Sequence, residues 1–219
     1  MFPDRISAGR LLTPLLERLR DRDPVILALP RGGVPVGVVV AEALGAPLDL
    51  ILVRKIGAPY QPELAIGAIA EGRTPLMELD AEAIAMLRAP PSYVEAEKAR
   101  QWRELERRRK AYRGSRRPLD LEGRTAILVD DGIATGATMR VAIVAARQRG
   151  AKAVVVAVPV APPEAVAELR ALADEVVCVE TPRMLFGVGA HYADFTQVSD
   201  EDVRDYLSAQ RSPVQAERR

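Results

Sequence analysis

The sequence predicts an α/β protein built on a doubly wound, mainly parallel β-sheet. Short unbroken runs of apolar residues recur along the chain, and segments with apolar residues at helical spacing separate them. An apolar run without alternation is typical of a strand that is covered on both faces, as in parallel sheets. Strands and helices that alternate in this way form right-handed crossovers, which place helices on both faces of one sheet.

The individual elements follow from these runs in chain order. Leucines at helical spacing predict a first helix over residues 6–19, and Pro24 separates it from the first strand. The apolar runs predict strands at residues 25–29, 48–53, 125–129, 153–158 and 176–179. The segments between these strands are predicted to be helices at residues 34–44, 137–149 and 163–172.

One region departs from this alternation. Residues 81–113 have a helical pattern that Pro90 and Pro91 interrupt, and we expect a helical insertion within a single domain spanning residues 1–219. From Glu95 to Arg113, acidic and basic residues are interspersed. We interpret this stretch as a solvated helix with ion pairs along its length, and an RNA-binding surface is the alternative.

The composition excludes several classes of protein. The chain has one cysteine, Cys178, and one histidine, His191. A disulfide scaffold or a thiolate zinc site needs several cysteines, and a Ser-His-Asp device would depend entirely on His191. The chain has 31 basic and 30 acidic residues, so its net charge is close to zero and does not by itself attract nucleic acid.

The apolar segments do not predict targeting or membrane insertion. Asp4 and Arg5 precede any stretch that could serve as the apolar core of a signal. The most apolar region, residues 34–53, is interrupted by Glu42, Pro47 and Asp49, so it is too polar for a spanning helix. The sequence therefore predicts a cytoplasmic protein that does not bind membranes.

The most informative stretch begins at the end of the strand predicted for residues 125–129. Two acids, Asp130 and Asp131, follow the strand directly, and a turn containing Thr135 and Gly136 then opens the next helix. The amides and the positive dipole end of a helix N-terminus suit a phosphate group, and glycine lets the backbone approach it closely. Paired acids beside such a turn are placed to accept hydrogen bonds from sugar hydroxyls.

This stretch resembles the phosphoribosyl diphosphate (PRPP) binding motif of type I phosphoribosyltransferases. Four apolar residues, two acids and a Thr-Gly-x-Thr loop occur in the same order in that family. The resemblance implies that Asp130 and Asp131 hold the ribose hydroxyls and, through PRPP and water, sense a Mg²⁺ ion. It also assigns binding of the 5′-phosphate to Thr135, Gly136, Ala137, Thr138 and Met139.

A second loop supports the resemblance. Pro30, Arg31, Gly32 and Gly33 follow the first predicted strand and open the next helix. Two consecutive glycines permit a nest of backbone amides that binds anions without side-chain obstruction. The loop resembles the pyrophosphate loop of the family, which implies a cis peptide bond between Pro30 and Arg31 and places Arg31, Gly32 and Gly33 at the diphosphate.

A third element follows the strand predicted for residues 48–53. Arg54 and Lys55 resemble a pair of cations that lies near the diphosphate in adenine-type members of the family. The Gly- and Pro-containing segment after them corresponds to the mobile catalytic lid, which excludes water during the reaction. In that segment Glu63 is a candidate catalytic residue that stabilises positive charge or handles a proton. A rigid turn with a surface ion pair is the alternative.

The resemblance also implies the reaction. A nitrogen nucleophile, expected to be a nucleobase, displaces pyrophosphate from PRPP with Mg²⁺ as cofactor, and the enzyme is expected to be a homodimer. In 6-oxopurine members an aspartate commonly stands where this chain has Ala134, which disfavours hypoxanthine and guanine. Together with Arg54 and Lys55, this shifts the comparison slightly toward adenine-type members without assigning the acceptor.

The acceptor site of the family is a variable hood, for which residues 181–207 are the candidate. Phe186, Tyr192 and Phe195 concentrate aromatic side chains in a chain in which only 4% of residues are aromatic. A planar base could stack on one of these rings. The alternative is that they anchor the C-terminal segment on the sheet.

Two other classes of function compete with the transferase hypothesis. A regulatory protein could use the same fold to sense PRPP and bind RNA or DNA through residues 100–117, although interspersed glutamates weaken that idea. A dinucleotide-dependent oxidoreductase is disfavoured because Gly32 and Gly33 lack the Gly-x-Gly-x-x-Gly spacing.

Overall fold

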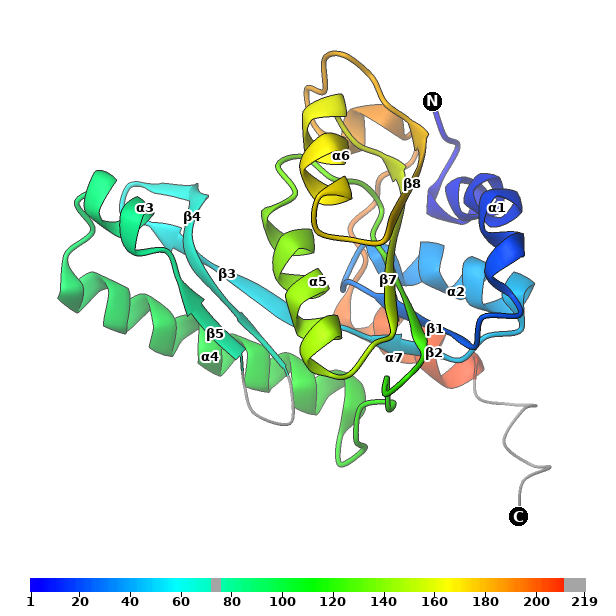
Figure 1. Ribbon diagram of the computed structural model, residues 1–219, viewed down its shortest axis with the longest axis horizontal. Coiled ribbons are helices and arrows are strands. Elements are labelled where there is room, and N and C mark those ends of the chain that lie inside the picture. The colour runs from blue at the N-terminus through cyan, green and yellow to red at the C-terminus, as the bar shows by residue number, and fades with distance from the viewer. Residues whose placement is uncertain (72–75, 211–219) are drawn as a thin grey trace.

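The computed structural model describes residues 1–71 and 76–210, and within these the side chains of residues 62 and 63 are not described. The chain forms a core around a five-stranded sheet, from which an arm with a three-stranded sheet and a long helix extends (Figure 1). Among the described residues no helix has the length and apolar character needed to cross a membrane.

The core sheet has the strand order β2-β1-β6-β7-β8, and all neighbouring strands are parallel. The strands are β1 (Pro24–Ala28), β2 (Leu48–Leu50), β6 (Thr125–Val129), β7 (Ala153–Val160) and β8 (Glu175–Glu180). From β1 the chain moves outward to β2, and from β6 it moves outward in the opposite direction to β7 and β8. The direction of winding therefore reverses between β1 and β6, which confirms the doubly wound prediction.

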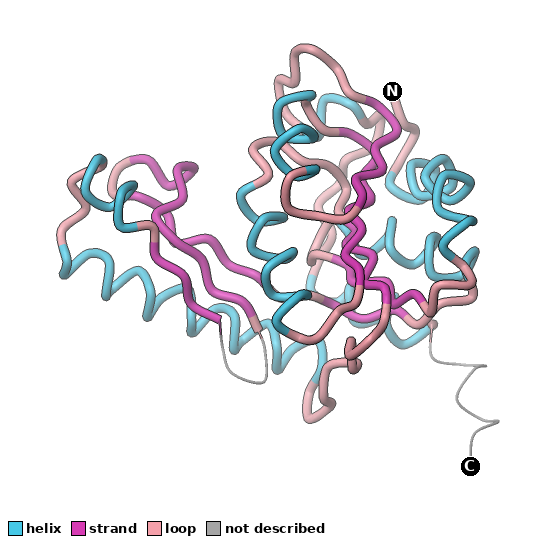
Figure 2. The backbone as a smooth tube through the Cα atoms, viewed as in Figure 1, coloured by secondary structure: helices cyan, strands magenta, loops and turns pink. Residues whose placement is uncertain are grey.

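Helices cover both faces of this sheet (Figure 2). One face carries α1 (Arg5–Leu16), the short 3-10 helix η1 (Glu17–Leu19) and α2 (Gly33–Leu44), which pack with Ile26 and Ile127. The other face carries α5 (Ala137–Gln148) and α6 (Pro163–Arg170), which pack with Leu27 and Leu128. Alternate residues of each strand serve the two faces, so the strands have to be apolar throughout.

The insertion is larger than the sequence predicted. An antiparallel sheet of β3 (Val53–Ala58), β4 (Gln61–Ala70) and β5 (Leu76–Leu79) precedes the helices α3 (Ala81–Met86) and α4 (Pro91–Arg113). The segment identified with the lid is therefore a hairpin, and the strand predicted for residues 48–53 divides into β2 and the first residue of β3. The sequence did not predict this sheet. Its apolar side chains, Ile56, Ile66 and Ile69, belong to a cluster that includes Val94 and Leu105 of α4.

The charged part of α4 forms ion pairs along the helix. Glutamates pair with cations three or four residues later at Glu95–Lys98, Glu97–Arg100, Glu104–Arg107, Glu104–Arg108 and Glu106–Arg109. Each such pair contributes only about 0.3–0.5 kcal/mol to helix stability. Because carboxylates lie beside these cations, the structure favours the interpretation as a solvated helix over that of an RNA-binding surface.

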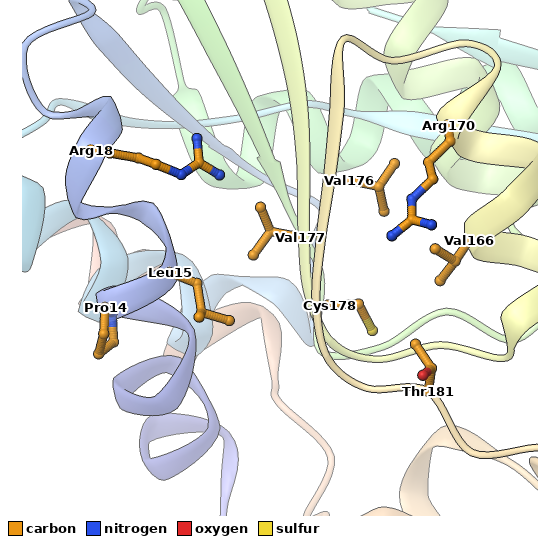
Figure 3. A pocket seen from close by; sticks show the side chains of 9 residues that line it. All are labelled: Pro14, Leu15, Arg18, Val166, Arg170, Val176, Val177, Cys178 and Thr181. Atoms are coloured by element: carbon orange, nitrogen blue, oxygen red, sulfur yellow. The ribbon is translucent and has the colours of Figure 1, made fainter.

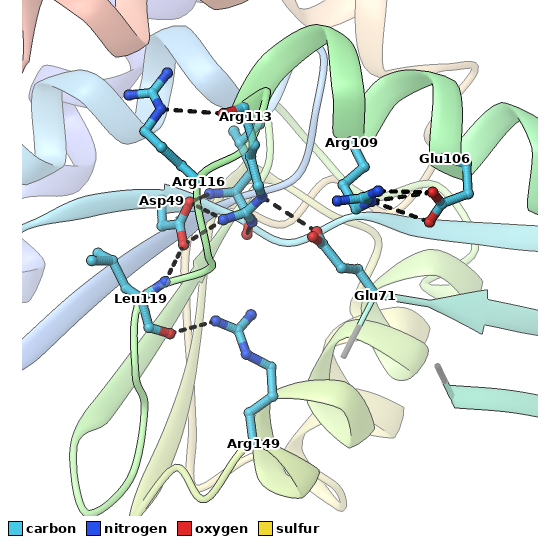
Figure 4. A network of polar contacts seen from close by, with 9 residues as sticks. Asp49, Glu71, Glu106, Arg109, Arg113, Arg116, Leu119 and Arg149 are labelled. Atoms are coloured by element: carbon cyan, nitrogen blue, oxygen red, sulfur yellow. Dashed lines mark hydrogen bonds and ion pairs between the residues drawn. The ribbon is translucent and has the colours of Figure 1, made fainter. Parts of the chain in front are cut away.

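A buried polar network joins the arm to the core (Figure 4). Arg113, at the end of α4, donates from Nη1 to Oδ1 and Oδ2 of Asp49 at 2.6 and 2.8 Å, and its Nε lies 3.3 Å from Oε2 of Glu71. The second oxygen of Asp49 also accepts the Leu119 amide at 2.8 Å. Burial raises the pKa of Glu71, and the charge of Arg113 opposes that shift. The end of α4 and the segment after it are thereby tied to β2, and Arg113 also joins them to the end of β4.

The C-terminal segment returns across the core. After β8 the chain forms a long loop with the 3-10 helix η2 (Val188–His191) and ends its described part in α7 (Asp200–Ala209). Helix α7 packs against α2 and α4. Its first residue, Asp200, accepts hydrogen bonds from Tyr112 Oη at 2.6 Å and Arg107 Nη1 at 2.7 Å. The predicted hood region therefore contacts both the core and the arm.

Candidate active site

Two predicted anion-binding loops lie side by side at the edge of the core sheet. Strands β1 and β6 are parallel neighbours, with Ala28 opposite Val129, and the Leu29 amide donates to the Val129 carbonyl at 2.8 Å. Each loop begins where its strand ends, at the point where the winding direction reverses. Ligands of open α/β sheets bind at such points.

The loop after β6 presents the N-terminus of α5 without a cap from a side chain. Gly136 is the N-cap residue, its φ is +74°, and the first turn of the helix contains no acid. The amides of that first turn have no partner within the helix, so they suit an anionic ligand. Met139 is 1% exposed and packs in the core, so it would contact a ligand only through its backbone.

The loop after β1 lies directly against the acid pair. The peptide bond between Pro30 and Arg31 is cis, as the resemblance implied. Helix α2 begins at Gly33 with Gly32 as an N-cap residue that cannot supply a side-chain cap, and its first turn contains no acid. A Cβ at Gly32 would overlap the Asp131 carboxylate, so the two loops are in close contact.

Replacing Gly33 with alanine is expected to cost about 1–3 kcal/mol of stability and to weaken pyrophosphate binding. The added Cβ would lie 2.5 Å from the Val129 carbonyl oxygen and 2.8 Å from the Asp130 Cα, so backbone would have to move. Urea unfolding and titration with pyrophosphate measure both effects. Gly45→Ala is the control, because open space surrounds Gly45 and only its φ of +63° strains alanine. Equal pyrophosphate affinities of the two variants would contradict the expectation.

The acid pair is held in an environment that disfavours two negative charges. The Asp131 amide donates to Oδ1 of Asp130 at 2.9 Å. Burial, together with the adjacent Asp131 charge, raises the pKa of Asp130 well above its ordinary value. Burial also raises the pKa of Asp131, although a hydrogen bond from Arg5 opposes that shift. Such a pair gains from a ligand that brings hydroxyl donors or a cation.

Arg5 is a member of this site that the sequence did not indicate. Its Nε donates to Oδ2 of Asp131 at 2.7 Å, across 126 positions of the chain. Arg5 is the first residue of α1, and in the sequence it was notable only as a charge near the N-terminus. No local motif connects it to Asp131.

The structure separates the two cations of the third element. Arg54 lies on the face of β3 that is covered by α4, where its Nε donates to Oε1 of Gln101 at 2.8 Å. Burial lowers the pKa of Arg54. Lys55 lies on the opposite face together with Val53, which packs against the core beneath α5. The side chain of Glu63 lies outside the described residues.

Arg31 connects the loop after β1 to the C-terminal segment. Its Nη1 lies 3.8 Å from Oδ1 of Asp200, the acid at the start of α7. Because Asp200 also binds Arg107 and Tyr112 of α4, the loop, the arm and the C-terminal helix meet at this carboxylate.

The three hood aromatics have different surroundings. Tyr192 is 5% exposed, its hydroxyl donates to the Asp131 carbonyl at 2.5 Å, and its ring packs against Phe2 and Phe195. Phe195 is 37% exposed and faces Arg5. Phe186 is 87% exposed on the loop after β8. The alternative prediction of an anchor for the C-terminal segment therefore describes Tyr192, while Phe186 is open to a ligand.

A pocket of ≈ 540 Å³ lies elsewhere, along the outer edge of β8 between α1 and α6 (Figure 3). Arg18, Arg170 and Cys178 are among its lining residues, and it contains none of the predicted site residues. Burial raises the pKa of the Cys178 thiol to about 11, so the thiol is protonated at neutral pH.

Asp130 and Asp131 could help to bind a metal ion only if other ligands, such as water and substrate oxygens, complete its coordination. Among the described residues no group of three or more metal-ligating side chains occurs. Two carboxylates are too few to enclose a cation, but they suit Mg²⁺ that keeps water and takes most of its oxygens from a phosphorylated substrate.

Comparison with known proteins identifies the class to which this fold and site belong. The family model of the phosphoribosyl transferase domain matches residues 6–194. The chain therefore belongs to the phosphoribosyl transferase domain family, and the predicted resemblance is confirmed.

Two similar proteins cover nearly all of this chain. A Mycobacterium tuberculosis (strain H37Rv) protein named "Putative phosphoribosyl transferase Rv0571c" is 47% identical over 207 residues, which are 94% of this chain and 46% of that protein. The crystal structure of TT1426 from Thermus thermophilus is 46% identical with a TM-score of 0.79, covering 96% of this chain and 99% of that one. The chain thus spans about half the length of the curated relative it matches.

Proposed function

We propose that the protein transfers a phosphoribosyl group from PRPP to a nitrogen acceptor and releases pyrophosphate in a Mg²⁺-dependent reaction. The observation that carries this proposal is the acid pair between two helix N-termini that lack side-chain caps, at the point where the sheet reverses its winding. Two anion sites separated by carboxylates match a substrate with phosphate at one end, ribose in the middle and diphosphate at the other.

In this proposal the chain acts by binding and orientation. The amides from Thr135 to Met139 hold the 5′-phosphate, and Asp130 and Asp131 accept hydrogen bonds from the ribose hydroxyls. The bond between the anomeric carbon and a diphosphate oxygen breaks, the acceptor nitrogen bonds to that carbon, and the pyrophosphate leaves with the bonding electrons. The acceptor nitrogen loses its proton to a base, a role for which Glu63 is the candidate. Positioned charges lower the barrier for a cationic transition state without a covalent nucleophile.

The leaving diphosphate would be received by the loop after β1. Gly32 and Gly33 form the start of α2, which has no side-chain cap, and the Gly33 amide already donates to the Leu29 carbonyl at 3.1 Å. Arg31 adds a positive charge there, with its Nη1 3.8 Å from Oδ1 of Asp200. Arg54 and Lys55 of β3 would add positive charge for the diphosphate, and Arg54 is held on the face covered by α4 through its hydrogen bond to Gln101. Bound Mg²⁺ would neutralise diphosphate charge and so make pyrophosphate a better leaving group.

We propose that the acceptor is a nucleobase and that it binds beside Phe186. The rings of Tyr192 and Phe195 are already engaged with Arg5 and with each other, whereas Phe186 is exposed. Ala134 is exposed at the start of the phosphate loop and offers no carboxylate to a 6-oxopurine. Adenine-type acceptors are therefore the first to test.

The deciding experiment is incubation with PRPP, Mg²⁺ and a panel of purine and pyrimidine bases, with pyrophosphate release as the measurement. We expect release with at least one base, and none when a chelator removes Mg²⁺ or when the base is omitted. Tight binding of NAD without any binding of PRPP would contradict the proposal. A homodimer and a cytoplasmic location remain predictions for size measurement and cell fractionation.

A further inference from the structure

We infer that Arg5 is a positioning residue of the ribose subsite, which holds the carboxylate of Asp131 in the direction that the ribose hydroxyls require. The inference rests on the proposed binding of PRPP. It adds to the site a residue that is far from the three motifs in the sequence and acts on the sugar through Asp131.

The contact between Arg5 and Asp131 is short and shielded from water. Arg5 Nε donates to Asp131 Oδ2 at 2.7 Å, and the two side chains are 11% and 13% exposed. Hydrogen bonds between charged groups are roughly twice as strong as neutral ones, and shielding from solvent increases their strength. One carboxylate oxygen of Asp131 is thereby committed to Arg5, which restricts how the carboxylate can turn.

The guanidinium is itself held from other sides. Its Nη1 donates to the Thr196 carbonyl at 2.9 Å, and its central carbon lies 3.9 Å from the centre of the Phe195 ring and 5.9 Å from that of Tyr192. Stacking on an aromatic ring uses the planar face of arginine and leaves its N–H groups free to donate within the plane. Arg5 is therefore oriented before any ligand arrives.

The backbone that carries Arg5 is also fixed. Asp4 caps α1 by accepting the Ser7 amide at 2.6 Å, and Arg5 is the first helical residue. Helix α1 packs against α2, the helix that begins in the loop after β1. The side chain thus projects from an element that is rigidly joined to the proposed diphosphate site.

The carboxylate of Asp131 lies between Arg5 and that loop. A Cβ at Gly32 would overlap Oδ2 of Asp131, which is the same oxygen that accepts the hydrogen bond from Arg5, so this oxygen is in contact with both the loop and Arg5. Without Arg5, Asp131 would repel Asp130 with no cation beside it, and its carboxylate could rotate away from the sugar position.

The test compares two probes that differ only in the sugar, ribose 5-phosphate and inorganic phosphate. In the wild type, the ratio of their affinities measures what the ribose contributes. We expect Arg5→Gln to weaken ribose 5-phosphate binding about tenfold and to leave phosphate binding unchanged. The KM for PRPP should rise more than kcat falls. General damage to the structure would weaken both probes and would not change their ratio.

Two further variants make the comparison sharper. Arg5→Lys keeps the charge but lacks the planar fork and the stacking face, so it should recover only part of the lost ribose 5-phosphate affinity. Arg10→Gln is the control, because Arg10 is exposed on the same helix, and it should bind both probes as the wild type does. Thermal unfolding of all variants verifies that they are folded. If Arg5→Gln does not fold, the affinity ratio of the two probes is compared between Arg5→Lys and the wild type instead.

The outcomes separate this inference from the proposed function. If the wild type prefers ribose 5-phosphate and Arg5→Gln keeps that preference, the role of Arg5 is overturned while the transferase proposal stands. Equal weakening of both probes in Arg5→Gln and in Arg5→Lys also overturns it. If the wild type binds ribose 5-phosphate no more tightly than phosphate, the assignment of the ribose to the acid pair fails, and this inference fails with it.

Discussion

Replacing Asp130 with asparagine is expected to abolish pyrophosphate release from PRPP without lowering the stability of the protein. Asparagine has nearly the same shape as aspartate, but it has no negative charge. It therefore cannot stabilise the cationic transition state or the Mg²⁺ ion of the proposed reaction. Loss of a positioned electrostatic group in an active site typically costs about 100- to 1,000-fold in kcat. The measurements are pyrophosphate release and the urea midpoint of unfolding.

The stability part of this prediction follows from the direction of the pKa shift. Burial and the adjacent Asp131 raise the pKa of Asp130 above its ordinary value of 3.8, so the folded state holds the proton more tightly than the unfolded state. Folding is therefore opposed by ionisation of Asp130, and this cost grows as the pH rises from about 4 through the raised pKa. Asparagine has no such cost.

The difference in stability between Asp130→Asn and the wild type should accordingly be near zero at pH 4 and should favour the variant at pH 8. Asp21→Asn is the control, because Asp21 is exposed in a turn, and it should change neither activity nor the pH dependence. A variant that is less stable than the wild type at pH 8 would show that the ionised Asp130 is stabilised by its surroundings, contrary to this expectation.

Replacing Arg113 with methionine is expected to cost about 3–5 kcal/mol of stability, because it removes the cation from the buried network (Figure 4). Asp49 and Glu71 would then remain in the interior, where they are 9% and 8% exposed, without the cation that contacts both of them. The more distant charge of Arg149 would offset this loss only in part. For a chain of this size, such a loss lowers the melting temperature by about 10 °C. Thermal and urea unfolding measure the change.

Arg109→Met is the matched control for this variant. Arg109 lies one turn earlier on α4 and pairs with Glu106 at 3.0 Å, but both side chains are about one-third exposed, so the loss should stay within about 1 kcal/mol. Adding Glu71→Gln to Arg113→Met should recover part of the stability, because one buried carboxylate is then neutral. Equal losses for the two arginine variants would contradict the structural role of the network.

Local sequence patterns predicted the core of the fold well, since strand and helix periodicities arise from the two faces of a single sheet. All five predicted core strands overlap the observed strands β1, β2, β6, β7 and β8. The arm was predicted less well. Its strands contain glycine and proline, and their apolar side chains are shared between the cluster that includes α4 and the cluster beneath α5, so they do not form the unbroken apolar runs of the core strands.

Within the site, the sequence by itself determined the two loops and the acid pair, because each follows directly from the end of a strand and the start of a helix. Only the tertiary structure decided which side chains reach them. Arg5 binds Asp131 from 126 positions away, Asp200 lies beside Arg31, and Arg54 faces α4 and not the loops. Such contacts depend on how separate elements pack, and residues that are far apart in the chain share no local spacing that could predict them.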